Sequence, residues 1–134
     1  MTRFAVAMVA MAAVLSPARA APLSTCAGST QMDLNQCAGA DFKRADAAMN
    51  AAYGKLMGQI GPKAQHGLRD AQKAWLPFRD KSCAREALGS EGGSIPPMIL
   101  AGCLAKLTTE RTKVLKGYLT CPEGDLPCIG RISE

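Results

Sequence analysis

The chain has 134 residues with a formal net charge of +5, and 48% of its residues are hydrophobic while only 4% are aromatic. This length allows one domain with a modest core and leaves no room for a second domain. The sixteen basic residues are interspersed with eleven acidic ones and form no Lys/Arg run, so the electrostatic footprint of a nucleic-acid-binding protein is missing.

The first twenty residues have the parts of a secretory signal peptide. Arg3 precedes an apolar run over residues 4–15, and Ala18 and Ala20 form the Ala-x-Ala pattern of a cleavage site. The run is too short to span a bilayer of about 30 Å as a helix. We therefore expect residues 1–20 to be removed on export, which leaves a periplasmic or secreted protein with no stable membrane anchor.

Cys26 raises an alternative, because a cysteine close behind a leader can carry a lipid. Leu23 stands three residues before it, as lipoprotein signals require, but Pro22 and Arg19 separate Cys26 from the apolar run. Thr25 is also bulky for a cleavage position. The sequence therefore favours a leader without a lipid anchor.

Six cysteines in an exported chain of this size indicate a disulfide framework. The spacings favour bridges between neighbours, which are Cys26 with Cys37, Cys83 with Cys103, and Cys121 with Cys128. In the chain-entropy model each bridge contributes about 3 kcal/mol. No Cys-x-x-Cys pair is present and His66 is the only histidine, so we expect neither a metal site nor another cofactor.

Helical spacing of apolar residues marks three segments within residues 21–120, and no alternating strand pattern competes with it. The first segment begins at Ser29 or Thr30, either of which can cap a helix, and it ends near Ile60 before Gly61 and Pro62. Its expected inner face consists of Phe42, Ala45, Met49, Tyr53, Leu56 and Ile60.

The second helix is expected from about Ala64 to Ala87, with a kink where Pro77 removes a backbone hydrogen bond. Its expected inner face consists of Leu68, Ala71, Trp75 and Phe78. Arg79 and Asp80 stand at the charged margin of this face, where we expect them to tie helices together.

The third helix is expected to start at Pro96 or Pro97 and to end near Thr120. Its expected inner face consists of Leu100, Leu104, Leu107, Val114 and Tyr118. The predicted fold class is therefore all-α, a small antiparallel bundle of three main helices that is stapled by disulfides. Residues 121–134 form a tail with its own local disulfide loop.

Two polar residues fall on faces that the bundle should bury. Asn35 continues the inner stripe of the first helix backward, and Arg111 interrupts that of the third. Arg111 can pair with Asp80 or Asp46 and so fix the register of the helices. Equally, it can lay its stem on the core and keep its charge in water.

The order of these motifs resembles the lysozyme inhibitor LprI-like N-terminal domain family over about residues 26–119. The first half of the resemblance lies in Cys26, Thr30 Gln31 Met32, Asn35 Gln36 Cys37 Ala38, Ala45 Asp46, Met49 Asn50 and Tyr53. The second half lies in Leu68 Arg69, Ala71 Gln72, Ala74 Trp75 Leu76, Phe78 Arg79 Asp80, Cys83, Gly92 Gly93 Ser94, Cys103 Leu104, Leu107 Thr108 and Arg111. Pro77 and the Cys121 and Cys128 pair depart from the family pattern.

The family takes its name from a mycobacterial lipoprotein that inhibits lysozyme. The resemblance implies that this chain is a secreted or periplasmic protein and a candidate inhibitor of lysozyme. It therefore implies a protein partner, either a lysozyme or an envelope protein. The family offers no set of contact residues to carry over to this chain. The alternative is an interaction or structural module with a different envelope or toxin partner.

The best candidate for contact with a partner is the loop over residues 89–94. A lysozyme cleft carries paired carboxylates, and an inhibitor must fill it with a rigid projection. The glycines permit close backbone approach, and a bridge from Cys83 to Cys103 would hold the loop. The expected contact residues are Ser90, Glu91, Gly92, Gly93 and Ser94. Glu91 has the wrong sign for an acidic cleft, and a plain flexible connector is the alternative.

Enzymatic activity is not expected. The chain has one histidine, no serine nucleophile motif and a plausible disulfide partner for every cysteine. Its aspartates are of the kind found on helix surfaces.

Overall fold

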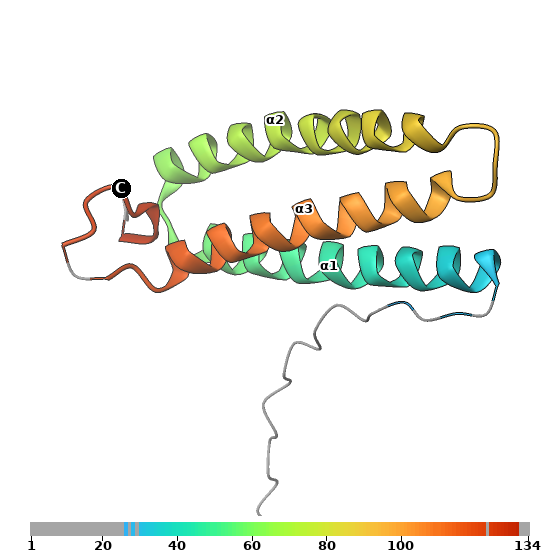
Figure 1. Ribbon diagram of the computed structural model, residues 1–134. Helices are drawn as coiled ribbons and strands as arrows, with labels where there is room; N and C mark the ends of the chain where they lie inside the picture. Colours follow the sequence, from blue (N-terminus) through green and yellow to red (C-terminus); the bar gives the residue numbers. More distant parts are fainter. Residues whose placement is uncertain (1–25, 27, 29, 123, 132–134) are drawn as a thin grey trace, which may run out of the picture.

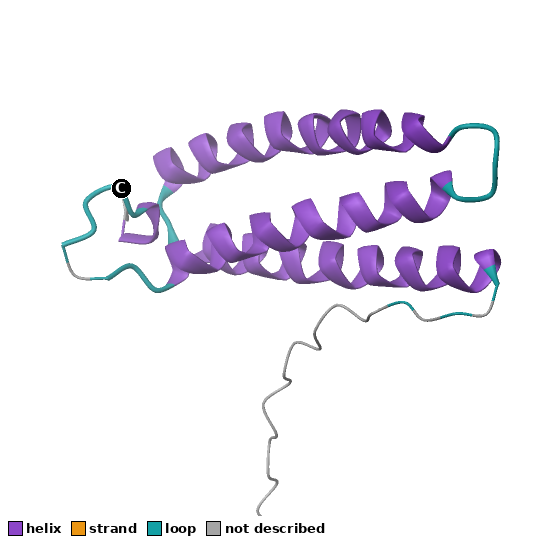
Figure 2. Cartoon of the chain, viewed as in Figure 1, coloured by secondary structure: helices purple, strands orange, loops and turns teal. Residues whose placement is uncertain are grey.

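The computed structural model describes residues 26–131 apart from residues 27, 29 and 123, so the expected signal peptide lies outside the described residues. Three long helices, α1 (Gln31–Gln59), α2 (Pro62–Ala87) and α3 (Pro96–Leu119), run so that α2 is antiparallel to both α1 and α3 (Figure 1). Short 3-10 turns follow at Leu88–Ser90 and Ile129–Arg131. All regular structure in the described part of the chain is helical (Figure 2), which confirms the predicted all-α class.

Local signals in the sequence set the ends of α1. Thr30 Oγ1 accepts a hydrogen bond from the backbone of Asp33, and Asp33 Oδ2 accepts one from the backbone of Thr30, both at 3.1 Å. This capping box satisfies two backbone donors that a helix start leaves open. At the other end, Gln65 Nε2 donates to the carbonyls of Met57 and Ile60 at 2.9 and 3.0 Å, so the first turn of α2 caps the last turn of α1.

Pro77 does not divide α2. The helix continues through it from Pro62 to Ala87, and Figure 1 draws it as a single, gently bowed rod. Because proline lacks the amide hydrogen that would donate one turn back, a bend is the local response that keeps the remaining hydrogen bonds intact.

Helices α1 and α3 pack closely along a seam of small residues. Ala38, Ala45 and Ala52 of α1 and Ala105 of α3 are all buried. Short side chains bring two helix axes close together. The backbone of α3 therefore lies against α1 along much of its length, whereas the backbone of α2 stays farther from both and reaches α1 through side chains such as Arg79.

The apolar core fills one half of the bundle, at the end where α1 turns into α2. Its buried members are Met49, Ala52, Leu56, Ile60, Leu68 and Leu115. Trp75 is half-buried against this cluster, as expected of a core residue of α2. The opposite half of the bundle holds fewer large buried apolar side chains among the described residues.

The expected inner faces of α2 and α3 are wrong in part. Phe78 is 62% exposed and Ala71 is exposed as well, and Val114 of α3 is 45% exposed. The buried residues of α2 lie at Leu68, Gln72, Arg79 and Cys83. This line is rotated by about one residue from the predicted one, because Gln72 and Arg79 find polar partners inside the bundle and can therefore be buried.

Three disulfides connect the elements. Cys26 joins Cys37, Cys83 joins Cys103, and Cys121 joins Cys128, which are the neighbour pairings that the spacings favour. The tail lies against the core end of the bundle, where Gln59 Nε2 donates to the carbonyl of Gly130 at 3.0 Å. A Cβ at Gly130 would collide with the carbonyl of Tyr118, so this close approach requires glycine.

Candidate functional site

Arg79 is the centre of a polar cluster between the three helices. It is only 7% exposed, and its guanidinium donates to Thr108 Oγ1 of α3 at 3.2 Å and to Asp46 of α1 at 3.4 Å. Its Nε and Nη2 atoms both donate to Asp80 Oδ1 at 2.8 Å. Arg79 thus ties all three helices together, while Asp80, on the same helix, holds the guanidinium in place.

Two aromatic rings flank the same guanidinium. Its central carbon lies 5.3 Å from the ring centroid of Phe42 and 5.4 Å from that of Trp75. Arginine stacks on aromatic faces because its charge is delocalised and weakly hydrated. With its nitrogens bonded to protein groups and two aromatic rings against it, this guanidinium serves the scaffold.

Arg111 does not pair with Asp80 or Asp46, so that predicted option is wrong. Its Nε donates to Gln72 Oε1 at 3.0 Å, and its guanidinium carbon lies 5.8 Å from the Trp75 ring centroid. Gln72 is 8% exposed and Arg111 is half-buried. Arg79 already holds Asp46 and Asp80, which leaves Arg111 to satisfy the buried amide oxygen of Gln72.

The loop over residues 89–94 turns the chain from α2 into α3 at the end of the bundle opposite the apolar core (Figure 1). Residues Glu91, Gly92, Gly93 and Ser94 are exposed, and Ser90 is half-buried with its hydroxyl donating to the carbonyl of Ala87 at 3.0 Å. Gly92 has a φ of 93°, a left-handed conformation that glycine adopts without strain.

Two features fix the base of this loop. The Cys83–Cys103 bridge joins α2 to α3 below it, and Asn35 Nδ2 of α1 donates to the carbonyl of Ser94 at 3.0 Å. Asn35 is half-buried, and it contacts the backbone of the loop where a buried network between helices was expected. The loop is attached to all three helices and yet presents exposed residues at its tip.

Exposed apolar side chains lie on either side of the loop in the chain and at the nearby start of α1, and the sequence alone did not single them out. Leu88 is 58% exposed, Ile95 is 44% exposed, and Met32 of α1 is 68% exposed. Gln31 Nε2 contacts Met98 Sδ at 3.7 Å, which places the start of α1 beside the start of α3. We call Met32, Leu88 and Ile95 the apolar collar. Leu88 and Ile95 directly flank the predicted loop in the sequence, and this position could have identified them as residues beside the candidate contact site.

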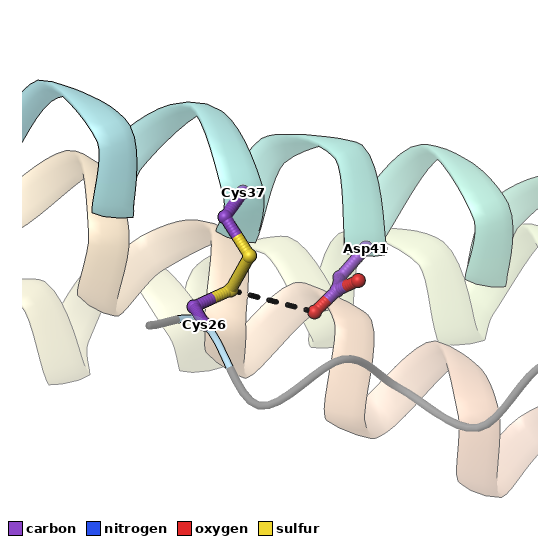
Figure 3. Close-up of side chains that lie close together, drawn as sticks. All are labelled: Cys26, Cys37 and Asp41. Atoms are coloured by element: carbon purple, nitrogen blue, oxygen red, sulfur yellow. Dashed lines mark hydrogen bonds between the residues drawn. A yellow bond between two sulfur atoms is a disulfide. The ribbon is translucent and has the colours of Figure 1, made fainter. Parts of the chain in front are cut away.

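Cys26, Cys37 and Asp41 form the one described cluster with metal-ligand residue types, with ligand atoms within 4.8 Å of one another (Figure 3). Figure 3 marks a 3.7 Å contact between Cys26 Sγ and Asp41 Oδ2. Both sulfurs are bonded to each other, so neither is the thiolate that binds zinc. Asp41 is buried and pairs with Arg44. The cluster fastens the chain before α1 onto that helix.

The same disulfide bears on membrane attachment. A lipid anchor on Cys26 would need the thiol that the bridge to Cys37 consumes. Among the described residues, no helix combines the length and apolar character needed to cross a membrane.

These features define a small extracytoplasmic protein whose helices are stapled by disulfides and which presents one anchored loop. The chain belongs to the LprI lysozyme inhibitor family, since the family described as "Lysozyme inhibitor LprI" matches residues 24–115.

The chain also has a bacterial relative. An uncharacterized protein of Rhizobium meliloti (strain 1021) is 38% identical over 107 residues, which cover 70% of this chain and 77% of that protein. No solved structure matches the chain.

Proposed function

We propose that this protein is a non-enzymatic, periplasmic or secreted inhibitor of a lysozyme, and that it acts by inserting the loop over residues 89–94 into the lysozyme cleft. Membership in the LprI family supports a protein partner of this kind. The observation that carries the proposal is an exposed loop that is fixed to three helices and flanked by exposed apolar side chains.

The loop has physical properties that suit a narrow cleft. Gly92 and Gly93 carry no side chains, so their backbone amides can approach carboxylates closely and donate hydrogen bonds to them. Because the bridge joins the two helices that carry the loop and Asn35 holds Ser94 at its end, binding orders few additional residues and loses little conformational entropy.

The apolar collar adds the area that the loop alone lacks. Met32, Leu88 and Ile95 are exposed in the free protein and would lose water against the rim of a cleft. Glu91 opposes binding, because it is the only charged residue in the loop and has the same sign as the cleft carboxylates.

The test is lysis of bacterial cells by lysozyme in the presence of the purified protein lacking its leader. We expect near-equimolar protein to slow lysis. Gly93→Trp should weaken inhibition by about tenfold or more, because its side chain would point into open space and obstruct docking without disturbing the fold. Gly58→Trp, at an exposed position of α1 that is equally open, is the matched control and should inhibit normally.

A charge reversal at Glu91 tests whether the loop enters an acidic cleft. Glu91→Lys should strengthen inhibition by about threefold or more, since it replaces repulsion with attraction in an acidic cleft. Glu110→Lys makes the same change in net charge on the exposed face of α3 and should have little effect. Unchanged lysis with several lysozymes, or equal effects of the two tryptophan variants, would contradict the proposal. A pull-down that returns an envelope or toxin protein in place of lysozyme would assign a different partner.

A further inference from the structure

A second surface lies at the other end of the bundle, in the groove between the C-terminal halves of α1 and α3. The groove has a volume of about 520 Å³. Its lining consists of Ala48, Ala51, Ala52, Lys55, Gln59, Lys116, Leu119 and Thr120. It shares no residue with the loop or the apolar collar, and the proposed inhibition makes no use of it.

The floor of the groove is mostly apolar. The alanines of α1 and Leu119 of α3 supply most of it. Grooves that recognise peptides offer separate pockets for successive side chains. A row of alanine methyl groups offers none, and it suits a flexible hydrocarbon chain that lies along the helices. The volume lies within the range of about 300–1,000 Å³ that is usual for small-molecule sites.

Cations flank this floor, one from each helix. Lys55 belongs to α1 and Lys116 to α3, and neither forms an ion pair with any residue that the structure describes. Lys116 also lies in the last turn of α3, where a cation complements the helix dipole. The helix dipole does not explain the position of Lys55, because this residue lies before the last turn of α1.

From the apolar floor and the two unpaired lysines we infer that this groove binds a long-chain carboxylate, with its hydrocarbon chain on the alanines and its carboxylate between Lys55 and Lys116. The chain would lose water against the floor, and the carboxylate would pair with the ammonium groups of the two lysines that line the groove. This makes the protein a carrier or sensor of single-chain anionic amphiphiles in addition to its proposed role toward lysozyme.

The test is calorimetric titration of the protein lacking its leader with dodecanoate, below the concentration at which dodecanoate forms micelles. We expect saturable binding of one equivalent. Dodecyltrimethylammonium, which has the same chain and the opposite charge, should bind at least about tenfold more weakly. Lys55→Gln combined with Lys116→Gln should weaken dodecanoate binding by about tenfold.

Matched control variants distinguish loss of binding in the groove from nonspecific effects of the substitutions on charge or folding. Lys43→Gln combined with Lys106→Gln removes one exposed lysine from each of the same two helices outside the groove, and it should leave binding unchanged. Ala51→Phe should block the floor, whereas Ala47→Phe, at an exposed position of α1 outside the lining, should not. Circular dichroism verifies that both phenylalanine variants remain folded.

Several results would overturn the inference. These are no saturable binding of dodecanoate, equal binding of the cationic amphiphile, or equal effects of a groove variant and its control. Binding of an acidic helical peptide in place of dodecanoate would assign the groove to a protein partner. Gly93→Trp should leave dodecanoate binding intact, so failure of this inference and failure of the lysozyme proposal can be told apart.

Discussion

At the scale of single residues, Arg79 explains how a charged side chain can occupy the interior of a small bundle. Its donors reach Thr108, Asp46 and Asp80, and Phe42 and Trp75 lie against its faces. Asp46 and Asp80 remain partly exposed, so water shares in solvating the charges. This arrangement avoids the full desolvation penalty of a dry ion pair, and it connects three helices through one side chain.

We expect Arg79→Lys to lower the free energy of unfolding by about 1–2 kcal/mol, although it keeps the charge. Lysine lacks the planar fork that bonds Asp80 through two nitrogens, and it stacks less well between rings. Urea unfolding followed by circular dichroism measures the change. Arg69→Lys, at an exposed position on the same helix, is the control and should change stability by less than about 0.5 kcal/mol. A fully stable Arg79→Lys variant would show that the fork adds nothing.

At the scale of elements, the sequence predicted where helices begin and end better than which side of each helix is buried. Thr30, Pro62 and Pro96 act through the backbone of their own neighbourhood, so their effect can be predicted from a short stretch of chain. The buried face of α2 depends on partners far away in the sequence. Phe78 is exposed and Arg79 is buried because Asp46 and Thr108 lie opposite, and no local pattern contains that information.

In the candidate site, too, the features set by local sequence could be predicted, and those set by distant contacts could not. The loop over residues 89–94 was predictable because its glycines break helices locally. Its anchoring by Asn35, and the addition of Met32 to the apolar collar, depend on α1 lying beside the start of α3. These contacts join residues far apart in the chain, so the sequence alone did not reveal them.

The effect of Pro77 on the stability of α2 can be tested by replacing this residue. Pro77→Ala restores an amide that can donate to the carbonyl of Lys73, and we expect it to raise the free energy of unfolding by about 1–2 kcal/mol. This is less than the full cost of about 3 kcal/mol for proline inside a helix, because the bundle has formed around a bowed α2. Thermal unfolding of both proteins measures the difference.

Pro62→Ala is the control for this effect. Pro62 occupies the first turn of α2, where its missing amide has no partner within the helix and its ring restricts the unfolded chain. Its replacement should leave stability unchanged or reduce it by less than about 1 kcal/mol. If Pro77→Ala destabilised the protein, the bowed shape of α2 would be required for packing against α3.

At the scale of the whole molecule, the two halves of the bundle are held together differently. The half near the α1–α2 turn contains the apolar core. The half that carries the loop depends on the Arg79 cluster and on two disulfides, Cys26–Cys37 and Cys83–Cys103. Two of the three disulfides thus lie where apolar burial is thin, and where a binding loop must be held in one position.

Removing the Cys83–Cys103 bridge should therefore open one half of the molecule and not the other. We expect replacement of both cysteines by alanine to lower the free energy of unfolding by about 3 kcal/mol. Amide hydrogen exchange should accelerate most in the second half of α2 and in the loop, while the core residues of α1 around Leu56 keep their protection. Inhibition of lysozyme should weaken in parallel, because the loop would have to be ordered on binding.

Replacing Cys121 and Cys128 by alanine is the comparison that tests this division. That bridge closes a separation of 7 residues in the tail, whereas Cys83–Cys103 spans 20, so its loss should cost somewhat less. Exchange should then increase in the tail and near Gln59, which bonds Gly130, with the loop over residues 89–94 unaffected. Uniform acceleration across all three helices in both variants would mean that the bundle opens as one unit, and the bridge near the loop would then have no special role in presenting it.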